Sequence, residues 1–260
     1  MISAKNIRYS IEGKEILHDI SFDAEDGEFI TLIGPNGCGK STFLKIMARI
    51  IKPTSGSVKF MGRELSSYKT KELARDLAIL PQSKNIPADV TVEQLVQYGR
   101  YPYTGLSGQL SSNDYSLVDM ALEETGMKKF KSRKISTLSG GESQMAWIAM
   151  AIAQTPKLLF LDEPTTYLDI CYQLEVLELV KRLNRELKLT TVLVLHDINQ
   201  ASQYSDRIYA MKAGSCYTCG KVNDVLTTET FKKVFSVKMK EYDDGPMKIY
   251  LPKEVIKEEK

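Results

Sequence analysis

Short apolar runs separated by polar turns organise most of the chain, and they predict alternating strands and helices. Residues 2–9 and 15–22 alternate apolar and polar side chains, which predicts two antiparallel strands joined by a turn at 12–14. Residues 28–34, EFITLIG, form a continuous apolar run that is typical of a parallel strand buried on both faces. A glycine-rich turn follows, and a helix is expected from about residue 40 to residue 50.

A helical block interrupts this alternation. After a short strand at 77–80, the stretch from about 84 to 155 indicates mostly helix, and Thr91 and Gln94 form a capping box at one helix start. The alternation returns with the apolar run LLFLD, a helix at 172–187 and the apolar strand TTVLVLHD. The apolar face of the 172–187 helix is expected to contain Leu174, Leu177, Val180 and Leu183.

Composition and charge narrow the class of protein. The chain has 260 residues, 43% of them hydrophobic and 26% charged, which is ordinary for a soluble globular protein. A net charge of +2 gives no global attraction to nucleic acid. The apolar runs are far shorter than the ~20 residues needed to cross a bilayer, and the N-terminus lacks an apolar signal core. We therefore expect a protein of the cytosol, unless a partner holds it at a membrane.

Two of the four cysteines form a C-x-x-C motif, Cys216 and Cys219. Such a motif can indicate a metal or redox site. It lies in MKAGSCYTCGKV, which is typical of a strand, a turn and a strand, and the sequence has no second Cys or His pair to complete a zinc site. A simple hairpin is the favoured interpretation.

A phosphate-binding loop follows the first buried strand. The stretch GPNGCGKST matches G-x-x-x-x-G-K-[ST] in the required place, after a strand and before a helix. Its glycines let backbone N–H groups surround a phosphate chain, Lys40 brings a positive charge to the β and γ phosphates, and the Ser41 hydroxyl can bind Mg²⁺. The expected nucleotide contacts are Gly34, Pro35, Asn36, Gly37, Cys38, Gly39, Lys40, Ser41 and Thr42.

Two acids end a later apolar strand, LLFLDE, at the edge where α/β sheets bind ligands. Asp162 is suited to hold Mg²⁺ through water, and Glu163 to polarise the attacking water. The alternative is that the pair merely caps the next element. The phosphate-binding loop favours the catalytic interpretation.

A second anion site is predicted about a hundred residues later, in TLSGGESQMAWIAMAIAQ. Ser139, Gly140 and Gly141 begin a helix whose unpaired N–H groups point outward, and Glu142 completes a capping box with Ser139. Hydrolysis of ATP requires donors on the side of the γ-phosphate that the first loop does not cover. Two copies arranged head to tail would each lend this turn to the other's ATP.

These motifs resemble those of ATP-binding cassette (ABC) ATPases, with LSGGE similar to the family's signature motif, and the resemblance covers essentially the whole chain. It implies an α/β fold: a P-loop NTPase core with an N-terminal antiparallel β subdomain and an inserted helical subdomain. The implied division is a core of about 1–83 and 156–235, a helical subdomain of about 84–155 and a C-terminal extension of about 236–260.

The resemblance also implies roles for single residues. Tyr9 would stack on adenine, Gln82 would sense Mg²⁺ and the partner protein, Asp169 would lie on a loop crossing the dimer interface, and His196 would contact the γ-phosphate. The implied catalytic residues are Lys40, Gln82, Glu163 and His196, and the implied Mg²⁺ ligands are Ser41, Gln82 and Asp162.

Within the family, VTVEQLVQYGRYPY, AWIAMAIAQ and DEPTTYLDICYQLEVLELV are most similar to ATPases of importers for ferric siderophores, haem and vitamin B12. The resemblance implies two ATPases on the cytoplasmic face of two membrane-spanning permease subunits, with an extracytoplasmic protein that delivers the substrate. We expect residues 82–100, which have a polar, proline-containing start, to receive a cytoplasmic loop of the permease.

Two positions depart from the family pattern: Glu142 stands where glutamine is usual, and Met145 where many relatives have arginine. Two other classes remain open. A cassette ATPase that remodels chromosomes or ribosomes is disfavoured because only 99 positions separate Lys40 from Ser139, without sustained heptads. A non-hydrolysing nucleotide switch is disfavoured by Glu163 and His196.

Overall fold

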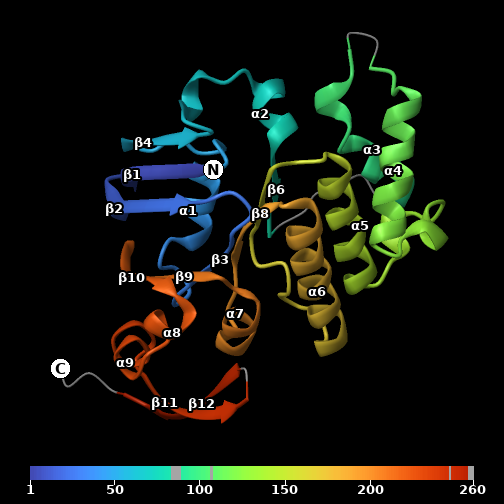
Figure 1. Cartoon of the computed structure of the whole chain (residues 1–260). Helices are drawn as coiled ribbons and strands as arrows, with labels where there is room; N and C mark the ends of the chain where they lie inside the picture. The colour runs from blue at the N-terminus through green and yellow to red at the C-terminus, as the bar shows by residue number, and fades with distance from the viewer. Residues whose placement is uncertain (83–88, 106–107, 246, 257–260) are drawn as a thin grey trace. The chain divides into compact units, whose positions relative to one another are not determined.

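The computed structural model describes residues 1–82, 89–105, 108–245 and 247–256 (Figure 1). The described chain divides into two compact units. The first unit contains residues 1–67 and 190–260. The second contains residues 68–189 and includes the predicted helical block. Part of the predicted docking segment, residues 83–88, lies outside the described residues, as do the last four residues of the predicted C-terminal extension.

An antiparallel sheet begins the first unit, in the order β2-β1-β4-β5. Its strands are β1 (Ile2–Ile11), β2 (Lys14–Ala24), β4 (Ser55–Phe60) and β5 (Arg63–Glu64). The predicted antiparallel pair is confirmed, and both strands extend beyond the expected bounds. A two-residue turn joins them at Glu12 and Gly13, whose φ angles of +49° and +80° suit a tight hairpin.

The central strands of the first unit are buried at every position, as their continuous apolar runs predict. Here β3 (Phe29–Ile33) pairs in parallel with β8 (Thr190–Val194) and β9 (Arg207–Lys212), and β10 (Ser215–Lys221) runs antiparallel to β9. The hairpin expected around the C-x-x-C motif is therefore confirmed. The helices of this unit are α1 (Lys40–Met47), α7 (Ile198–Tyr204), α8 (Val222–Val225) and α9 (Thr228–Phe235).

Helix α1 ends at Met47, earlier than the predicted residue 50. Arg49 adopts the left-handed conformation, with φ +59°. Its N–H donates to the Ile46 carbonyl, and the N–H of Ile50 donates to the Lys45 carbonyl. This is the Schellman arrangement that closes many helices, and its usual sequence signal is glycine. The sequence missed this helix end because arginine occupies the glycine position.

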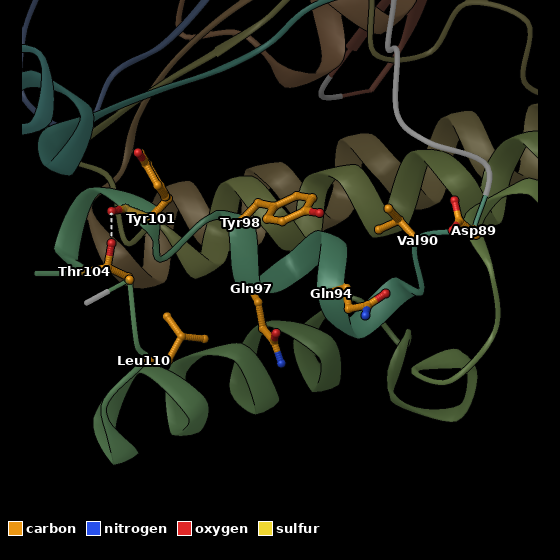
Figure 2. A pocket seen from close by; sticks show the side chains of 9 residues that line it. Asp89, Val90, Gln94, Gln97, Tyr98, Tyr101, Thr104 and Leu110 are labelled. Atoms are coloured by element: carbon orange, nitrogen blue, oxygen red, sulfur yellow. Dashed lines mark hydrogen bonds between the residues drawn. The ribbon is translucent and has the colours of Figure 1, made fainter. Parts of the chain in front are cut away.

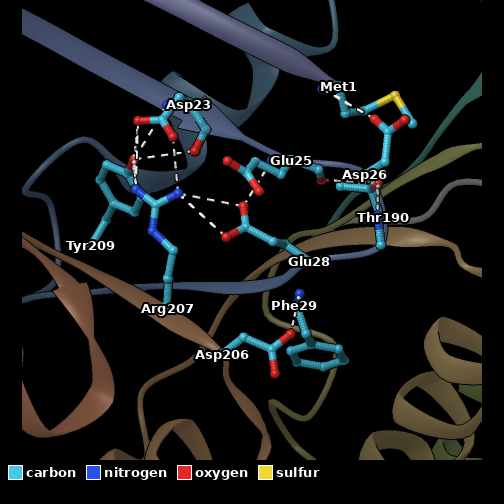
Figure 3. Close-up of polar contacts among 11 residues, drawn as sticks. Met1, Asp23, Glu25, Asp26, Glu28, Phe29, Thr190, Asp206, Arg207 and Tyr209 are labelled. Atoms are coloured by element: carbon cyan, nitrogen blue, oxygen red, sulfur yellow. Dashed lines mark hydrogen bonds and ion pairs between the residues drawn. The ribbon is translucent and has the colours of Figure 1, made fainter.

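A polar network joins the end of β2 to the starts of β3 and β9 in the first unit (Figure 3). The Arg207 guanidinium lies 2.9 Å from a carboxylate oxygen of Asp23, 3.4 Å from Glu28 and 3.1 Å from the Tyr209 hydroxyl. Asp206 accepts a hydrogen bond from the Phe29 N–H at 2.8 Å. The Arg207 hydrogen bond holds the pKa of Asp23 below its usual value. Stabilising charges thus gather at the amino ends of β3 and β9, and the carboxyl ends carry the candidate site.

A β-hairpin that the sequence did not predict closes the first unit. It consists of β11 (Val237–Asp244) and β12 (Met247–Val255). Tyr250 is 1% exposed and packs on Phe231, with the ring centroids 5.1 Å apart. The Asn199 side chain of α7 exchanges two hydrogen bonds with the Tyr250 backbone. The hairpin is therefore attached to α7 and α9.

The second unit consists of two parallel strands and a set of helices, in agreement with the predicted helical block. Its strands are β6 (Leu77–Leu80) and β7 (Leu158–Leu161), which pair with each other. Its α-helices are α2 (Thr70–Asp76), α3 (Val92–Tyr98), α4 (Ser112–Glu124), α5 (Gly140–Ala153) and α6 (Ile170–Leu187). The predicted capping box at Thr91 and Gln94 is confirmed at the start of α3.

A buried ion pair ties three helices of this unit together. The Arg100 side chain is 3% exposed, and its Nε donates to Asp114 at 2.9 Å, while its Nη1 donates to the Ala153 carbonyl at 2.7 Å. The guanidinium also lies 3.7 Å from the Tyr103 ring centroid. A Cβ on Gly99 would lie 2.2 Å from the Met150 carbonyl oxygen, so only glycine allows α3 to approach α5 this closely.

Helix α6 differs from its prediction at its start and on its face. It begins at Ile170, because the Asp169 side chain caps it by accepting from the Tyr172 N–H at 3.0 Å. Leu174 is 38% exposed, whereas Leu177, Val180 and Leu183 are buried, so placing all four on one face was wrong. Each step of three residues turns ~60° short of a full turn, so a run of such steps leaves the buried face. None of the helices in the described residues is long and apolar enough to cross a membrane.

Candidate nucleotide-binding site

The loop between β3 and α1 has a backbone that requires glycine. Gly34, Gly37 and Gly39 have φ angles of +149°, +74° and +101°, in the region that side chains disfavour. A Cβ on Gly34 would lie 2.2 Å from the Met211 carbonyl oxygen, and one on Gly39 would lie 2.5 Å from the Leu17 side chain. The loop therefore packs against its neighbours, with a backbone that can approach a phosphate chain closely.

Lys40 lies at the centre of this loop and is only 5% exposed. Its ammonium donates to the carbonyl oxygens of Gly34 at 2.8 Å and Pro35 at 2.9 Å. Cys38 is also buried, which raises the pKa of its thiol and keeps the group neutral beside the lysine. Asn36 is exposed, and Ser41 and Thr42 are half-buried at the start of α1. A fixed cation, a helix start and a glycine-rich backbone form a suitable phosphate site.

Two further predicted residues lie in the same unit. His196 is exposed just beyond the carboxyl end of β8, where the Leu195 N–H donates to the Leu32 carbonyl at 3.2 Å. Because β3 and β8 are parallel, His196 and the glycine loop follow strand ends on the same edge. Tyr9 is half-buried and pairs with Leu17, the residue whose side chain lies against Gly39.

The second unit brings the predicted acids together with Gln82. Asp162 is 2% exposed and follows β7, and Gln82 follows the neighbouring strand β6. The Gln82 side-chain amide donates to Glu163 Oε2 at 2.6 Å, and the Thr166 hydroxyl donates to the same oxygen at 3.2 Å. Glu163 has φ +53°, an unusual conformation for a side-chain-bearing residue and one that is concentrated at functional sites.

These groups surround a cavity of about 40 Å³. That volume suits one water molecule, which needs several polar partners. Four of the lining residues were not among the predicted site residues: Pro81, Gln144, Thr166 and Tyr167. Gln144 is 7% exposed, and the available signal was a polar side chain on the otherwise apolar face of α5. The lining residues are Pro81, Gln82, Gln144, Asp162, Glu163, Thr166 and Tyr167.

The second predicted anion site has the expected local structure. The Ser139 hydroxyl accepts from the Glu142 N–H at 3.2 Å, and the Glu142 carboxylate accepts from the Ser139 N–H at 2.8 Å, which confirms the capping box. The backbone hydrogen bond from Ser139 lowers the pKa of Glu142. A Cβ on Gly141 would lie 2.3 Å from the Tyr172 ring, whereas a Cβ on Gly140 would make only an ordinary contact, 3.9 Å from Leu168 Cδ2.

Exposed apolar side chains surround the predicted dimer-crossing loop. Asp169 itself caps α6, but Tyr167 is 95% exposed and Ile170 is 76% exposed.

Met145, one of the two departures from the family pattern, is 7% exposed. An uncharged side chain suits that buried position better than an unpaired arginine.

The chain matches the family model of the ABC transporter over residues 17–166, a range that includes the glycine loop, the signature turn and both acids. It belongs to the ABC transporter ATPase family. ATP-binding subunits of this family are ATPases, so this chain binds ATP and hydrolyses it. The α/β fold, with an antiparallel β region and a helical region, agrees with that of solved ABC cassettes.

Several relatives align with nearly the whole chain. It is 41% identical over 257 residues to the petrobactin import ATP-binding protein FpuC of Bacillus anthracis, covering 99% of this chain and 94% of that protein. It is 43% identical over 236 residues to the iron(3+)-hydroxamate import ATP-binding protein FhuC of Bacillus subtilis, covering 91% and 88%. The chain is thus similar to ATP-binding proteins of iron-chelate import systems.

Solved structures of similar proteins agree with the assignment to the ABC transporter ATPase family. One, described as a metal-chelate type ABC transporter in an inward-facing conformation, superposes with a TM-score of 0.85 and 27% identity over 97% of each chain. A dimeric ABC cassette bound to ADP and phosphate superposes with a TM-score of 0.75 and 29% identity, covering 85% of this chain and 99% of that one.

Proposed function

We propose that this chain is the ATP-hydrolysing subunit of an importer for an iron chelate, such as a ferric siderophore or haem, or for a related metal chelate such as cobalamin. The hydrolytic part of the proposal rests on the Glu163 carboxylate, which Gln82 and Thr166 orient beside a cavity of the size of a water molecule. The transport part rests on the similarity to iron-chelate import proteins along most of the chain.

In this proposal Lys40 and the loop N–H groups bind the β and γ phosphates, and Tyr9 stacks on adenine. Glu163 accepts a proton from the attacking water, while the Gln82 amide fixes its orientation. His196 donates a hydrogen bond to the γ-phosphate, where negative charge spreads during transfer.

Mg²⁺ is part of the proposed substrate complex. As the family resemblance implies, Ser41, Gln82 and Asp162 would hold it, because hydroxyl, amide and carboxylate oxygens are the ligands that this hard cation prefers. When bound, Mg²⁺ neutralises charge on the β and γ phosphates.

The test of the hydrolytic assignment is Glu163→Gln. The amide keeps the size of the side chain but cannot take the proton, so we expect hydrolysis to fall at least ~10²-fold with ATP binding retained. The variant should accumulate as an ATP-bound dimer in size-exclusion chromatography. Glu178→Gln, on the exposed side of α6, is the matched control and should turn over normally. Near-normal hydrolysis by Glu163→Gln would refute its role as the base.

We further propose a head-to-tail homodimer in which Ser139 and Gly140 contact the nucleotide of the partner copy. The exposed positions of Ser139 and Gly140 and the exposed Tyr167 and Ile170 support this arrangement. Inactive Lys40→Ala and Ser139→Arg subunits are mixed, so that both lesions can fall at one composite site and leave the other whole. Mixing should restore part of the activity. If confirmed heterodimers stay inactive at every ratio, the shared site is wrong.

The permease is proposed to dock on a groove of about 510 Å³ beside α3 in the second unit (Figure 2). Tyr98 and Tyr101 line it and are 53% and 65% exposed. Exposed aromatic side chains of this kind are enriched at protein interfaces. The remaining described lining residues are Asp89, Val90, Gln94, Gln97, Thr104, Gly108 and Leu110.

The double variant Tyr98→Ala, Tyr101→Ala should abolish uptake of the metal chelate by cells. ATP hydrolysis by the isolated subunit should be unchanged. Tyr115→Ala is the matched control, because Tyr115 is 52% exposed on α4 and does not line the groove. Normal uptake by the double variant would place the permease elsewhere.

The transported substrate is tested in cells with an in-frame deletion of the gene and no redundant ATPase. We expect loss of uptake of one of three labelled substrates: a ferric siderophore, haem or cobalamin. The proposal includes an extracytoplasmic binding protein, attachment to the cytoplasmic face of the membrane and no nucleic-acid partner. Unchanged uptake of all three would overturn the import assignment and favour a non-transport cassette ATPase, without affecting the chemistry.

A further inference from the structure

The C-x-x-C motif of β10 lies on one face of its strand because the strand is bulged. Cys216 pairs with Met211 of β9, and Cys219 pairs with Tyr209. Met211 and Tyr209 are two residues apart, so they lie on the same face of β9. The cysteines opposite them therefore share a face of β10, although they are three residues apart in the sequence. The extra residue is accommodated by the irregularity between Cys216 and Thr218. Without that bulge, the two cysteines would point to opposite faces.

The two thiols share a strand face but have different environments. The Cys216 thiol donates to the Thr218 carbonyl, with a sulfur–oxygen distance of 3.6 Å. Cys219 is exposed and Cys216 is half-buried. Burial, followed by the nearby Cys219, raises the pKa of Cys216 to about 12. Cys219 is therefore the thiol that a solution oxidant can reach, and Cys216 is suited to follow as the second, resolving thiol.

The strand segment beside this pair supports the phosphate-binding loop. The Met211 carbonyl oxygen packs against Gly34, where a Cβ would lie 2.2 Å away. The Gly214 N–H donates to the Cys38 carbonyl at 3.1 Å, and the Gly214 carbonyl accepts from the His18 N–H at 2.7 Å. The β9–β10 hairpin thus contacts both ends of the turn that carries the loop glycines.

We propose that Cys216 and Cys219 are a redox-responsive dithiol whose oxidation to a disulfide weakens ATP binding by the glycine loop. Closing the bond would draw the two residues together across the bulge, shift the position of Cys216 against Met211, and alter the support that Met211 and Gly214 give to the loop. Within the described residues, no group of three or more His, Cys, Asp and Glu side chains could hold a metal ion.

The oxidant is a small disulfide such as oxidised glutathione. The Cys219 thiolate attacks one of its sulfurs, forming a mixed disulfide and releasing one thiolate. Cys216 then loses its proton to solvent and attacks the Cys219 sulfur, which releases the second thiolate. Two protein thiols are oxidised and one small disulfide is reduced to two thiols. Because the Cys216 proton must leave, the second step should be faster at alkaline pH.

The test compares reduced and oxidised forms of the full-length protein. Wild type is treated with oxidised glutathione at mildly alkaline pH, the bond is located by non-reducing peptide mapping, and the affinity for a fluorescent ATP analogue is measured. We expect a Cys216–Cys219 bond and a loss of affinity of about five-fold or more, reversed by dithiothreitol. Cys216→Ser and Cys219→Ser, which keep Cys38 and Cys171, should retain their affinity through the same treatment.

Three outcomes would overturn the proposal: no bond between Cys216 and Cys219 in the treated wild type, a bond with unchanged affinity, or an equal loss of affinity in both serine variants. The last outcome would assign the effect to Cys38 or Cys171. The reduced protein in the same experiment reports ATP binding itself, so failure of the redox proposal leaves the ATPase assignment intact.

Discussion

The chain begins two helices with glycine turns, and the turns are built differently. The loop before α1 is enclosed, because Gly34 and Gly39 pack against β9 and β2 and Lys40 is buried among its carbonyls. The turn before α5 is held by side chains, because Ser139 and Glu142 cap their own helix. A Cβ on its Gly140 would make only an ordinary contact, 3.9 Å from Leu168 Cδ2.

The difference separates a phosphate-binding loop that supplies its own cation from a helix start that supplies none. The first loop fixes its backbone by steric fit and supplies its own cation, which a phosphate chain requires. The second turn uses part of its hydrogen-bonding capacity locally and offers an exposed face without a lysine. Such a face suits a nucleotide held by another subunit, in agreement with the proposed head-to-tail dimer.

Of the substitutions that test this comparison, Lys40→Ala is expected to have the largest effect, on the rate of ATP hydrolysis. The change removes the only ammonium that donates to the loop carbonyls in the described part of the loop. We expect hydrolysis to fall ~10²-fold or more, the effect of losing one preorganised donor to a developing anion. Lys45→Ala, on the same helix, is the control and should hydrolyse ATP at the wild-type rate in a phosphate-release assay.

Steric fit in the first loop is tested by Gly34→Ala. Its Cβ would approach the Met211 backbone oxygen, which cannot move aside as a flexible side chain can, and its φ is unfavourable. We expect a loss of ~1–3 kcal/mol in the free energy of unfolding, together with weaker ATP binding. Gly105→Ala has open space and an ordinary φ, so its denaturation midpoint should match that of wild type. Equal midpoints for the two variants would show that the loop is not sterically fixed.

The sequence predicted the parts of both sites that follow from local patterns. The glycine loop, the capping boxes and the strand ends each depend on a few consecutive residues, and the structure confirms them. Contacts between distant segments were not predictable. Tyr172 against Gly141 and Gln144 beside Glu163 depend on how helices pack, which single-sequence periodicity does not encode. The β11–β12 hairpin was missed because charged residues interrupt its alternation.

The packing of the second turn is tested by its two glycines. Gly141→Ala would place a Cβ 2.3 Å from the Tyr172 ring, so we expect a loss of ~1–2 kcal/mol in the free energy of unfolding. Gly140→Ala should leave stability close to that of wild type, because its Cβ would lie 3.9 Å from Leu168 Cδ2, an ordinary van der Waals contact. Combining Gly141→Ala with Tyr172→Leu should recover part of the stability in chemical denaturation. No recovery would mean that the ring does not cause the loss.

The smallest effect is expected from Glu142→Gln, which separates the two roles of that side chain. Glutamine keeps the hydrogen bond to the Ser139 N–H, because both residues serve in a capping box, so the melting temperature should change little near neutral pH.

The effect of the Glu142 charge can be separated from its capping of α5 by measuring stability against pH and by measuring dimerisation. Since hydrogen bonding lowers the pKa of Glu142, its contribution to stability is present above the usual carboxyl pKa and is lost as pH falls through the lowered value. The glutamine variant should lose less stability than wild type across that acidic range. If Ser139 and Gly140 face a partner's γ-phosphate, removing the negative charge should also strengthen ATP-dependent dimerisation about two- to five-fold, measured by analytical ultracentrifugation. Unchanged dimerisation would mean that the Glu142 carboxylate does not face the nucleotide, and that its capping of α5 is its whole role.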